Sequence, residues 1–184
     1  TSTGPGVTNG VTGLFEAGFA SSRVMMIAGQ IDSAYYGKGK GFLHEAENQL
    51  PLLRTVTGRT ESVRRPEEIG EAVFRVAQDI NTGRPRPGAV EIPIDFQYAK
   101  AEIDIPHVEA WPRKAPDRDA IARAVEAIRN AKKVVIWAGG GVLTAGAEGE
   151  LSQLAEALQA AGMARTALLV GADVTVGHQV MLHG

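Results

Sequence analysis

The 184-residue sequence has no cysteine, so disulfide bonds, thiolate catalysis and cysteine-ligated metal sites are all excluded. Aromatic residues are scarce at 5%, and the aliphatic-rich remainder suits an α/β protein better than a β-sandwich. Nineteen basic and 21 acidic residues give a net charge of −2 and form no basic block, so no nucleic-acid partner is expected. No apolar run approaches the roughly 20 residues that cross a bilayer, and no signal peptide is visible, so we expect no membrane contact and a cytoplasmic location.

Three apolar segments of the chain predict strands. Residues 24–28 and 134–137 are continuous apolar runs, typical of strands buried on both faces, and apolar residues alternate along residues 89–94. A chain of this length can bury a substantial core and can hold one domain or parts of two. Amphipathic segments lie between the strands, and strands that alternate with helices indicate a parallel sheet. The sequence therefore predicts an α/β fold.

Four helices are predicted from apolar periodicity and from their end signals. A first helix follows Asn9, and a second has Pro66 in its first turn and ends at Gly83. A third is capped by Asp117, and a fourth covers residues 147–158. Each of these segments has one apolar face, so each is expected to pack on a sheet.

Proline spacing and mixed charge between residues 96 and 116 are typical of an extended linker. We therefore expect a first domain over residues 1–98, a linker over residues 99–116 and a second domain over residues 117–184. Glycine, lysine and polar residues dominate residues 31–53, which predicts a solvated loop. In this organisation the predicted strands at residues 24–28 and 134–137 belong to separate sheets.

The first nine residues, Thr-Ser-Thr-Gly-Pro-Gly-Val-Thr-Asn, form a loop that leads into the first predicted helix. Gly4 and Gly6 allow backbone angles that other residues avoid, and they let a ligand approach the main chain closely. Pro5 stiffens the turn between them. The free N–H groups of a first helical turn can hold polar ligand atoms. From these residues alone, a structural turn is the simpler interpretation, and a ligand-binding loop is the alternative.

Residues 3–9, followed by Val-Thr-Gly at 11–13, resemble the pyrimidine-domain signature of thiamine-diphosphate enzymes. Within these enzymes the chain is most similar to the acetohydroxyacid (acetolactate) synthase large subunit, whose pattern is T-S-G-P-G-x-T-N-x-V-T-G. Residues 83–95 resemble its block G-R-P-G-P-V-x-x-x-I-P-x-D, and residues 138–142 resemble the glycine turn that opens its central domain. The resemblance weakens after about Gly162. It implies a partial pyrimidine-binding domain with parallel strands, followed by a Rossmann-like central domain.

The same resemblance implies a carboligase or decarboxylase that acts on 2-oxo acids and works as a homodimer or homotetramer. Its cofactors would be thiamine diphosphate and Mg²⁺, and in several members also FAD. The resemblance assigns thiamine-diphosphate contacts to Thr3, Gly4, Pro5, Gly6 and Asn9, and FAD contacts to Gly139, Gly140 and Gly141. From the residues alone, these last three glycines are tight-turn residues of a strand-turn-helix unit.

Residues 42–45, Phe-Leu-His-Glu, stand where the family carries A-F-Q-E, a segment close to the reactive thiazolium and the substrate. Glu45 matches the family glutamate, whereas His44 replaces the glutamine and Leu43 replaces the phenylalanine. Histidine titrates near neutral pH, so His44 is the candidate catalytic residue that hydrogen-bonds a substrate oxygen or moves a proton. The alternative is a surface histidine that caps a helix.

Two parts of the family machinery are not found in the sequence. The glutamate that activates the aminopyrimidine would precede Thr1, and the G-D-G motif that binds Mg²⁺ would lie in a third domain. We therefore expect an internal fragment without metal ligands of its own and without thiamine-dependent activity by itself. Two other functions stay open: a non-catalytic dinucleotide-binding module built on the glycine turn at 139–141, and a structural or regulatory domain. Residues 182–184, Leu-His-Gly, resemble a family M-H-G segment.

Overall fold

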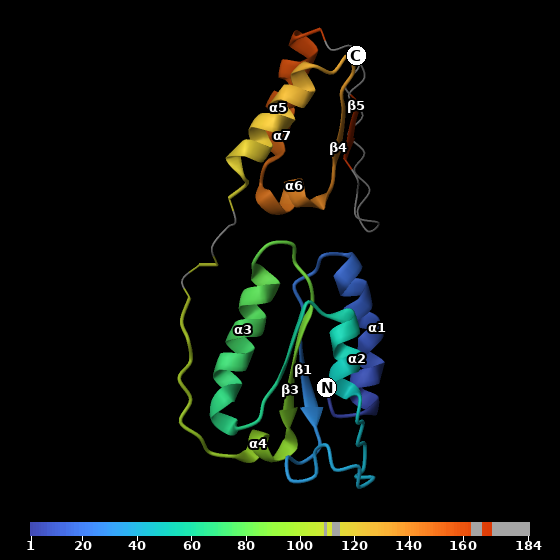
Figure 1. Ribbon diagram of the computed structural model, residues 1–184, viewed down its shortest axis with the longest axis vertical. Coiled ribbons are helices and arrows are strands. Elements are labelled where there is room, and N and C mark those ends of the chain that lie inside the picture. Colours follow the sequence, from blue (N-terminus) through green and yellow to red (C-terminus); the bar gives the residue numbers. More distant parts are fainter. Residues whose placement is uncertain (109, 112–114, 163–166, 171–184) are drawn as a thin grey trace. The chain divides into compact units, whose positions relative to one another are not determined.

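The computed structural model describes residues 1–108, 110–111, 115–162 and 167–170 (Figure 1). The chain divides into two compact units, Thr1–Lys114 and Ala115–Gly184. Both units are built of helices and parallel strands, which confirms the predicted α/β class. Among the described helices, none is long and apolar enough to cross a membrane. The resemblance at residues 182–184 lies outside the described residues.

The first unit is built on a three-stranded parallel sheet with the strand order β1-β3-β2. The strands are β1 (Met25–Gln30), β2 (Arg59–Ser62) and β3 (Gly88–Pro93). Met25 pairs with Gly88 and Gln30 with Pro93, so β1 and β3 are in register over their full length. All six residues of β3 are buried, because this central strand is covered on both faces. The carboxyl ends of the strands therefore meet at one edge, where parallel sheets bind ligands.

Helices cover the two faces of this sheet (Figure 1). Helices α1 (Pro5–Phe19) and α2 (Gln49–Val56) pack on one face through Val7, Leu14 and Leu53, which contact Ala28 and Ala89. The opposite face carries α3 (Ile69–Asn81), preceded by the 3-10 turn η1 (Pro66–Glu68). Its apolar residues Ala72, Val76 and Ile80 pack on Val63, Val90 and Ile92. Successive residues of β3 thus face different helices, as the alternation along a strand requires.

Several element boundaries differ from the predicted ones. Helix α1 begins at Pro5, ahead of the predicted start after Asn9, because proline fits the first helical position and Gly4 turns the chain into it. The predicted loop 31–53 contains the start of α2, and β2 was not predicted. Residue Ile94 does not extend β3 but begins the short helix α4 (Ile94–Tyr98).

The second unit consists of α5 (Arg118–Arg129), β4 (Val135–Ala138), α6 (Gly140–Ala145), α7 (Glu148–Ala160) and β5 (Ala167–Val170). Strands β4 and β5 pair in parallel. The predicted cap of α5 is confirmed, since the Asp117 carboxylate accepts a hydrogen bond from the Asp119 N–H at 2.9 Å. The segment that forms β4 is predicted to be buried on both faces, and this prediction is wrong. Val135 and Trp137 are 63% and 77% exposed, whereas Ala138 is buried, so only one face of β4 is covered.

Candidate functional site

Three polar side chains are buried together at the carboxyl edge of the first sheet. Gln30 ends β1, Gln49 begins α2 and Glu91 lies near the end of β3, and their exposed fractions are 2%, 1% and 0%. We call these three residues the buried polar cluster. Glu91 shares its strand face with Ala89, so its side chain is directed toward α1 and α2. Burial of polar groups is tolerated only where they are hydrogen-bonded, so the contacts of the cluster decide its role.

Glu91 accepts four hydrogen bonds. Its Oε2 accepts from Gln30 Nε2 at 3.1 Å and from Gln49 Nε2 at 2.9 Å. Its Oε1 accepts from the Tyr36 hydroxyl at 2.9 Å and from Ser62 Oγ at 3.0 Å. An ionised carboxylate only accepts hydrogen bonds, and here all four partners donate. The carboxylate therefore ties together all three strands, helix α2 and the loop that follows β1.

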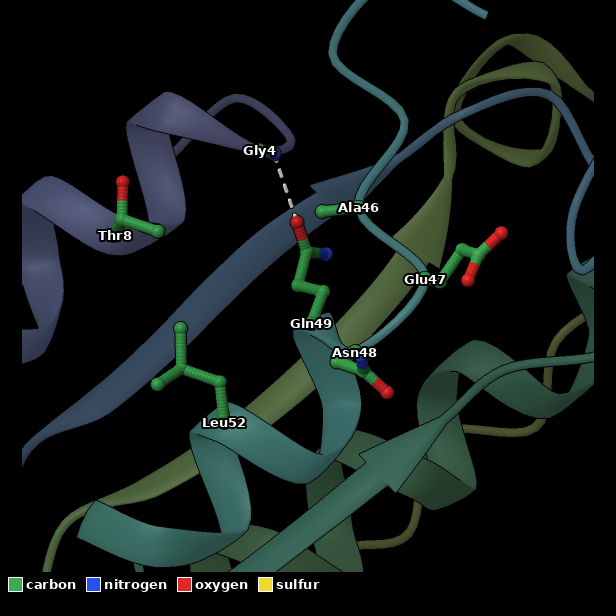
Figure 2. A pocket seen from close by; sticks show the side chains of 7 residues that line it. All are labelled: Gly4, Thr8, Ala46, Glu47, Asn48, Gln49 and Leu52. Carbon is green, nitrogen blue, oxygen red and sulfur yellow. Dashed lines mark hydrogen bonds between the residues drawn. The ribbon is translucent and has the colours of Figure 1, made fainter. Parts of the chain in front are cut away.

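Gln49 connects the cluster to the start of the chain. Its Nε2 donates to Glu91 and to the Gly29 carbonyl at 2.9 Å, and its Oε1 accepts from the Gly4 N–H at 2.8 Å (Figure 2). The same oxygen lies 3.2 Å from the Thr3 hydroxyl. Figure 2 shows the Gln49 side chain reaching from the first turn of α2 to the turn that precedes α1. One buried amide thus holds the Gly-Pro-Gly turn against the sheet edge.

The turn itself requires glycine at position 4. Gly4 is buried and has a φ of +57°, in the left-handed region that side chains rarely adopt. A Cβ at this position would lie 2.6 Å from the carbonyl oxygen of His44, a backbone atom. Residue Thr1, at the start of the chain, lies beside β1, since the Gly29 N–H donates to the Thr1 carbonyl at 2.9 Å. The Gly-Pro-Gly turn is therefore a fixed part of the sheet edge.

His44 lies in a turn directly against this loop. Its φ is +65°, its side chain is exposed, and its carbonyl lies 3.4 Å from the Thr3 hydroxyl. It does not cap α2, because the N-cap residue is Asn48. The helix-cap alternative is therefore wrong, and the imidazole lies at the surface beside the Gly-Pro-Gly turn. Its catalytic role stays a prediction.

The other predicted site residues fall into two groups. Pro5 and Asn9 are exposed on the first turns of α1, close to the buried Gly4 and the half-buried Thr3 and Gly6. Their common position at the start of one helix brings the five predicted thiamine contacts together with His44. By contrast, Gly139, Gly140 and Gly141 belong to the second unit, where Gly139 is the N-cap of α6.

A hollow of about 380 Å³ lies between the starts of α1 and α2. Its lining consists of Gly4, Thr8, Ala46, Glu47, Asn48, Gln49 and Leu52 (Figure 2). The surface of the hollow is mainly apolar, with Ala46 and Leu52 among its lining residues. No cluster of three His, Asp or Glu side chains that could hold a metal ion occurs within the described residues.

Two acidic residues anchor the loop between β1 and α2. At its start, the Asp95 carboxylate accepts hydrogen bonds from the Ser33 N–H at 2.9 Å and the Ser33 hydroxyl at 2.5 Å. Burial acts to raise the pKa of Asp95, but these hydrogen bonds outweigh it, and the pKa is lowered. Further along, burial and the Glu91 carboxylate raise the pKa of Tyr36, so its hydroxyl stays protonated and donates. The loop that carries His44 is thus held near its start, at Ser33 and Tyr36.

The buried polar cluster is not among the sites predicted from the sequence. Gln49 falls in the predicted loop 31–53, and Gln30 lies two residues beyond the predicted strand 24–28. A usable signal existed for Glu91, which is the single charged residue of β3. A charged side chain in a central strand must be paired, so this residue indicated a buried network.

Comparison with known proteins defines the class to which this fold and site belong. Residues 1–52 match the model for the N-terminal TPP binding domain of thiamine pyrophosphate enzymes, and residues 121–169 match the model for their central domain. The chain belongs to the thiamine pyrophosphate enzyme family, as the resemblance predicted. It carries regions of the N-terminal and central domains of that family.

Several curated relatives align with most of the chain. A probable 2-ketoarginine decarboxylase of Pseudomonas aeruginosa is 34% identical over 160 residues, which cover 86% of this chain and 28% of the relative. A probable acetolactate synthase large subunit of Methanocaldococcus jannaschii is 34% identical, with 83% of this chain and 27% of the relative covered. A sulfoacetaldehyde acetyltransferase of Alcaligenes xylosoxydans xylosoxydans is 36% identical, with 85% and 25% covered. The chain thus spans about a quarter of the length of these relatives, whose names describe different reactions.

Proposed function

We propose that the chain works as part of a thiamine-diphosphate-dependent carboligase or decarboxylase that acts on 2-oxo acids. The observation that carries this proposal is the Gly-Pro-Gly turn, which Gln49 and the left-handed Gly4 hold at the carboxyl edge of a parallel sheet. The family match over residues 1–52 includes this turn. Because the matched segment is 25–28% of the relatives' length, the proposed activity is that of the whole enzyme, of which these residues supply one part.

In this proposal the start of α1 holds the aminopyrimidine half of the cofactor. The residues involved are Thr3, Gly4, Pro5, Gly6 and Asn9. When bound, thiamine diphosphate supplies the carbanion stabilisation that decarboxylation of a 2-oxo acid needs. The protein supplies a fixed contact surface: Gly4 and Gly6 keep the main chain accessible, and Pro5 keeps the turn rigid. The Mg²⁺ that holds the diphosphate would take its ligands from outside these residues.

We propose that His44 contacts the substrate. Its backbone lies against Thr3 and Gly4, so its exposed imidazole is mounted beside the same turn that holds the aminopyrimidine. An imidazole at this place can donate a hydrogen bond to a substrate oxygen or transfer a proton to it. The replacement of the family glutamine by histidine would then be a difference in acid-base chemistry between this chain and the synthases.

The glycine turn at 139–141 is the place proposed for a nucleotide contact. Gly139 is the N-cap of α6, and all three glycines are exposed. We propose FAD as its ligand in the whole enzyme, and a non-catalytic dinucleotide-binding role is the alternative. Copurification of a flavin with the whole enzyme favours FAD, whereas nicotinamide nucleotide binding without thiamine diphosphate favours the alternative. In either case a homodimer or homotetramer is the proposed assembly.

The proposed function is tested by CO₂ release from a panel of 2-oxo acids, measured with the whole enzyme in the presence and absence of thiamine diphosphate and Mg²⁺. Release that depends on the cofactor supports the proposal, and cofactor-independent or absent release across the panel contradicts it. The 184-residue chain by itself should match the buffer blank with pyruvate. A few main-chain contacts to a pyrimidine cannot offset the freedom that the cofactor loses on binding.

A further inference from the structure

We infer that Glu91 is a positioning residue for the Gly-Pro-Gly turn and that it acts through Gln49. Glu91 lies on the central strand and Gly4 precedes α1, and the side chain of Gln49 bridges them. In this arrangement Glu91 and the Gly29 carbonyl together decide which way the Gln49 amide points, and the Gln49 amide decides how the Gly4 N–H is held. The inference deepens the proposed function, on which it rests for the identity of the ligand that the turn contacts.

The direction of the Gln49 amide follows from donors and acceptors alone. Glu91 Oε2 and the Gly29 carbonyl both accept from Gln49 Nε2, each at 2.9 Å. With the NH₂ group fixed between these two acceptors, Gln49 Oε1 must face Gly4, whose N–H donates to it at 2.8 Å. A flipped amide would set the NH₂ group against the Gly4 N–H, and two donors would then face each other. The carboxylate thus acts with the Gly29 carbonyl and the Gly4 N–H to disfavour the alternative amide orientation.

Three further hydrogen bonds fix the orientation of the Glu91 carboxylate. Gln30 Nε2 shares Oε2, whereas Tyr36 and Ser62 occupy Oε1. The carboxylate is therefore held from four elements and cannot rotate away from Gln49 without losing several buried hydrogen bonds. Ordering a flexible turn on binding reduces the net free energy of binding. A turn that is already ordered before the ligand binds avoids this cost. The expected function of Glu91 is therefore tighter cofactor binding through preorganisation.

Two substitutions at position 91 separate positioning from charge. In Glu91→Gln, the amide oxygen can take the place of Oε2 and the NH₂ group the place of Oε1, where the Tyr36 and Ser62 hydroxyls can turn to accept. This variant keeps the acceptor that orients Gln49. Glu91→Met has a similar length but provides no such acceptor, and Gln49→Met removes the bridge itself. The matched control is Glu61→Gln on β2, which removes a carboxylate bonded to Arg59 and Arg75 but not to the cluster.

The experiment measures two quantities in the whole enzyme. The first is the half-saturating concentration of thiamine diphosphate, which should rise about tenfold in Glu91→Met and Gln49→Met, because the ligand must now order the turn. The second is amide hydrogen exchange over residues 1–10, which should become faster in the same two variants while α3 keeps its protection. Glu91→Gln and Glu61→Gln should stay within about twofold of the parent in both quantities. A merely structural role would lower the amount of folded enzyme and would leave the half-saturating concentration unchanged.

Several results would overturn the inference. The inference fails if amide hydrogen exchange over residues 1–10 stays at the parent rate in both Met variants. It also fails if Glu61→Gln changes this exchange as much as the Met variants do. If the parent enzyme binds no thiamine diphosphate, the proposed function fails, and the exchange measurement decides the inference by itself. If the Met variants do not fold, Gln49→Glu decides it, because its carboxylate faces both the Glu91 carboxylate and the Gly29 carbonyl and should make hydrogen exchange over residues 1–10 faster. Exchange at the parent rate in this variant overturns the inference.

Discussion

The two glycine turns of the chain have similar sequences and different physical requirements. The first, at Gly4 and Gly6, is buried at the sheet edge, and its Gly4 has a φ of +57° and no space for a Cβ. The second, at residues 139–141, begins α6, and Gly139 has an ordinary φ of −103°. Among the described residues, no atom lies within 4 Å of a Cβ built on any of these three glycines. A glycine cluster in a sequence therefore does not show by itself whether the backbone needs glycine.

The two glycine turns also differ in the kind of binding surface that they offer. The first turn is fixed by protein contacts before any ligand arrives, since Gln49 and His44 both touch it. The second turn offers open backbone at a helix start, where the Thr144 hydroxyl of the same helix donates to the Gly140 carbonyl at 3.1 Å. We therefore expect substitutions at the first turn to change stability and cofactor binding together, and substitutions at the second to change at most ligand contacts.

The largest effect is expected for Gly4→Ala. A left-handed backbone costs an alanine about 1–2 kcal/mol, and the 2.6 Å approach to the His44 carbonyl adds the cost of moving the main chain. We expect a loss of about 3 kcal/mol in the free energy of unfolding, measured by urea denaturation. Gly13→Ala is the matched control on α1, because a Cβ there meets no atom of the described residues within 4 Å. A Gly4→Ala variant as stable as its parent would show that the turn is not held as described.

The second prediction concerns the imidazole beside the first turn. His44→Ala should lower turnover by about 100-fold, the usual size of a general acid-base contribution, with a smaller change in thiamine-diphosphate affinity. His44→Asn is the control for the backbone, since asparagine tolerates the positive φ of 65° but cannot titrate. Both variants should lose turnover alike if the imidazole transfers a proton. Full turnover in His44→Asn would exclude proton transfer by His44, and full turnover in His44→Ala as well would remove its side chain from the chemistry.

The strands β1, β3 and β4 and the helices α1, α3, α5 and α7 could be predicted from sequence, because continuous apolar runs, amphipathic periodicity and helix caps are local signals. The strand β2 could not, since Arg59, Thr60, Glu61 and Ser62 carry no apolar pattern and become a strand by pairing with β3. The start of α1 was missed although Pro5 was an available signal for a first helical position.

The candidate site was predicted only in part, because the sequence shows motifs and not the contacts between them. The first motif gave Thr3 and Gly4, and the separate segment 42–45 gave His44; these three residues do lie together. Neither segment gave Gln49 or Glu91, because their roles arise from long-range hydrogen bonds across the sheet edge. Long-range polar contacts of this kind have no periodicity in the sequence, so only the strand position of Glu91 hinted at them.

The third prediction tests the support of the loop that carries His44. Asp95 has a lowered pKa in the folded protein, so its contribution to stability is present above the ordinary pKa of an aspartate, about 4, and is lost as the pH falls through the folded pKa. Asp95→Asn should therefore reduce the free energy of unfolding at pH 7 by a small amount and should have less effect at pH 3. Urea denaturation at both pH values measures the difference. A constant difference between the two would show that the Ser33 contact does not depend on the charge of Asp95.

The smallest effect is expected at the second turn, and its sign is opposite to that at Gly4. Gly141 lies inside α6 with no positive φ and with open space around its Cβ position among the described residues, so Gly141→Ala gains helix propensity at no steric cost. Replacing glycine by alanine inside a helix stabilises it by roughly 0.5–1 kcal/mol, and we expect a small rise in thermal stability. If FAD or a dinucleotide contacts this backbone closely, the same methyl group should weaken its binding while stability rises. A loss of more than about 1 kcal/mol would mean that the second turn is as constrained as the first, because alanine is destabilising only where the backbone or the space requires glycine.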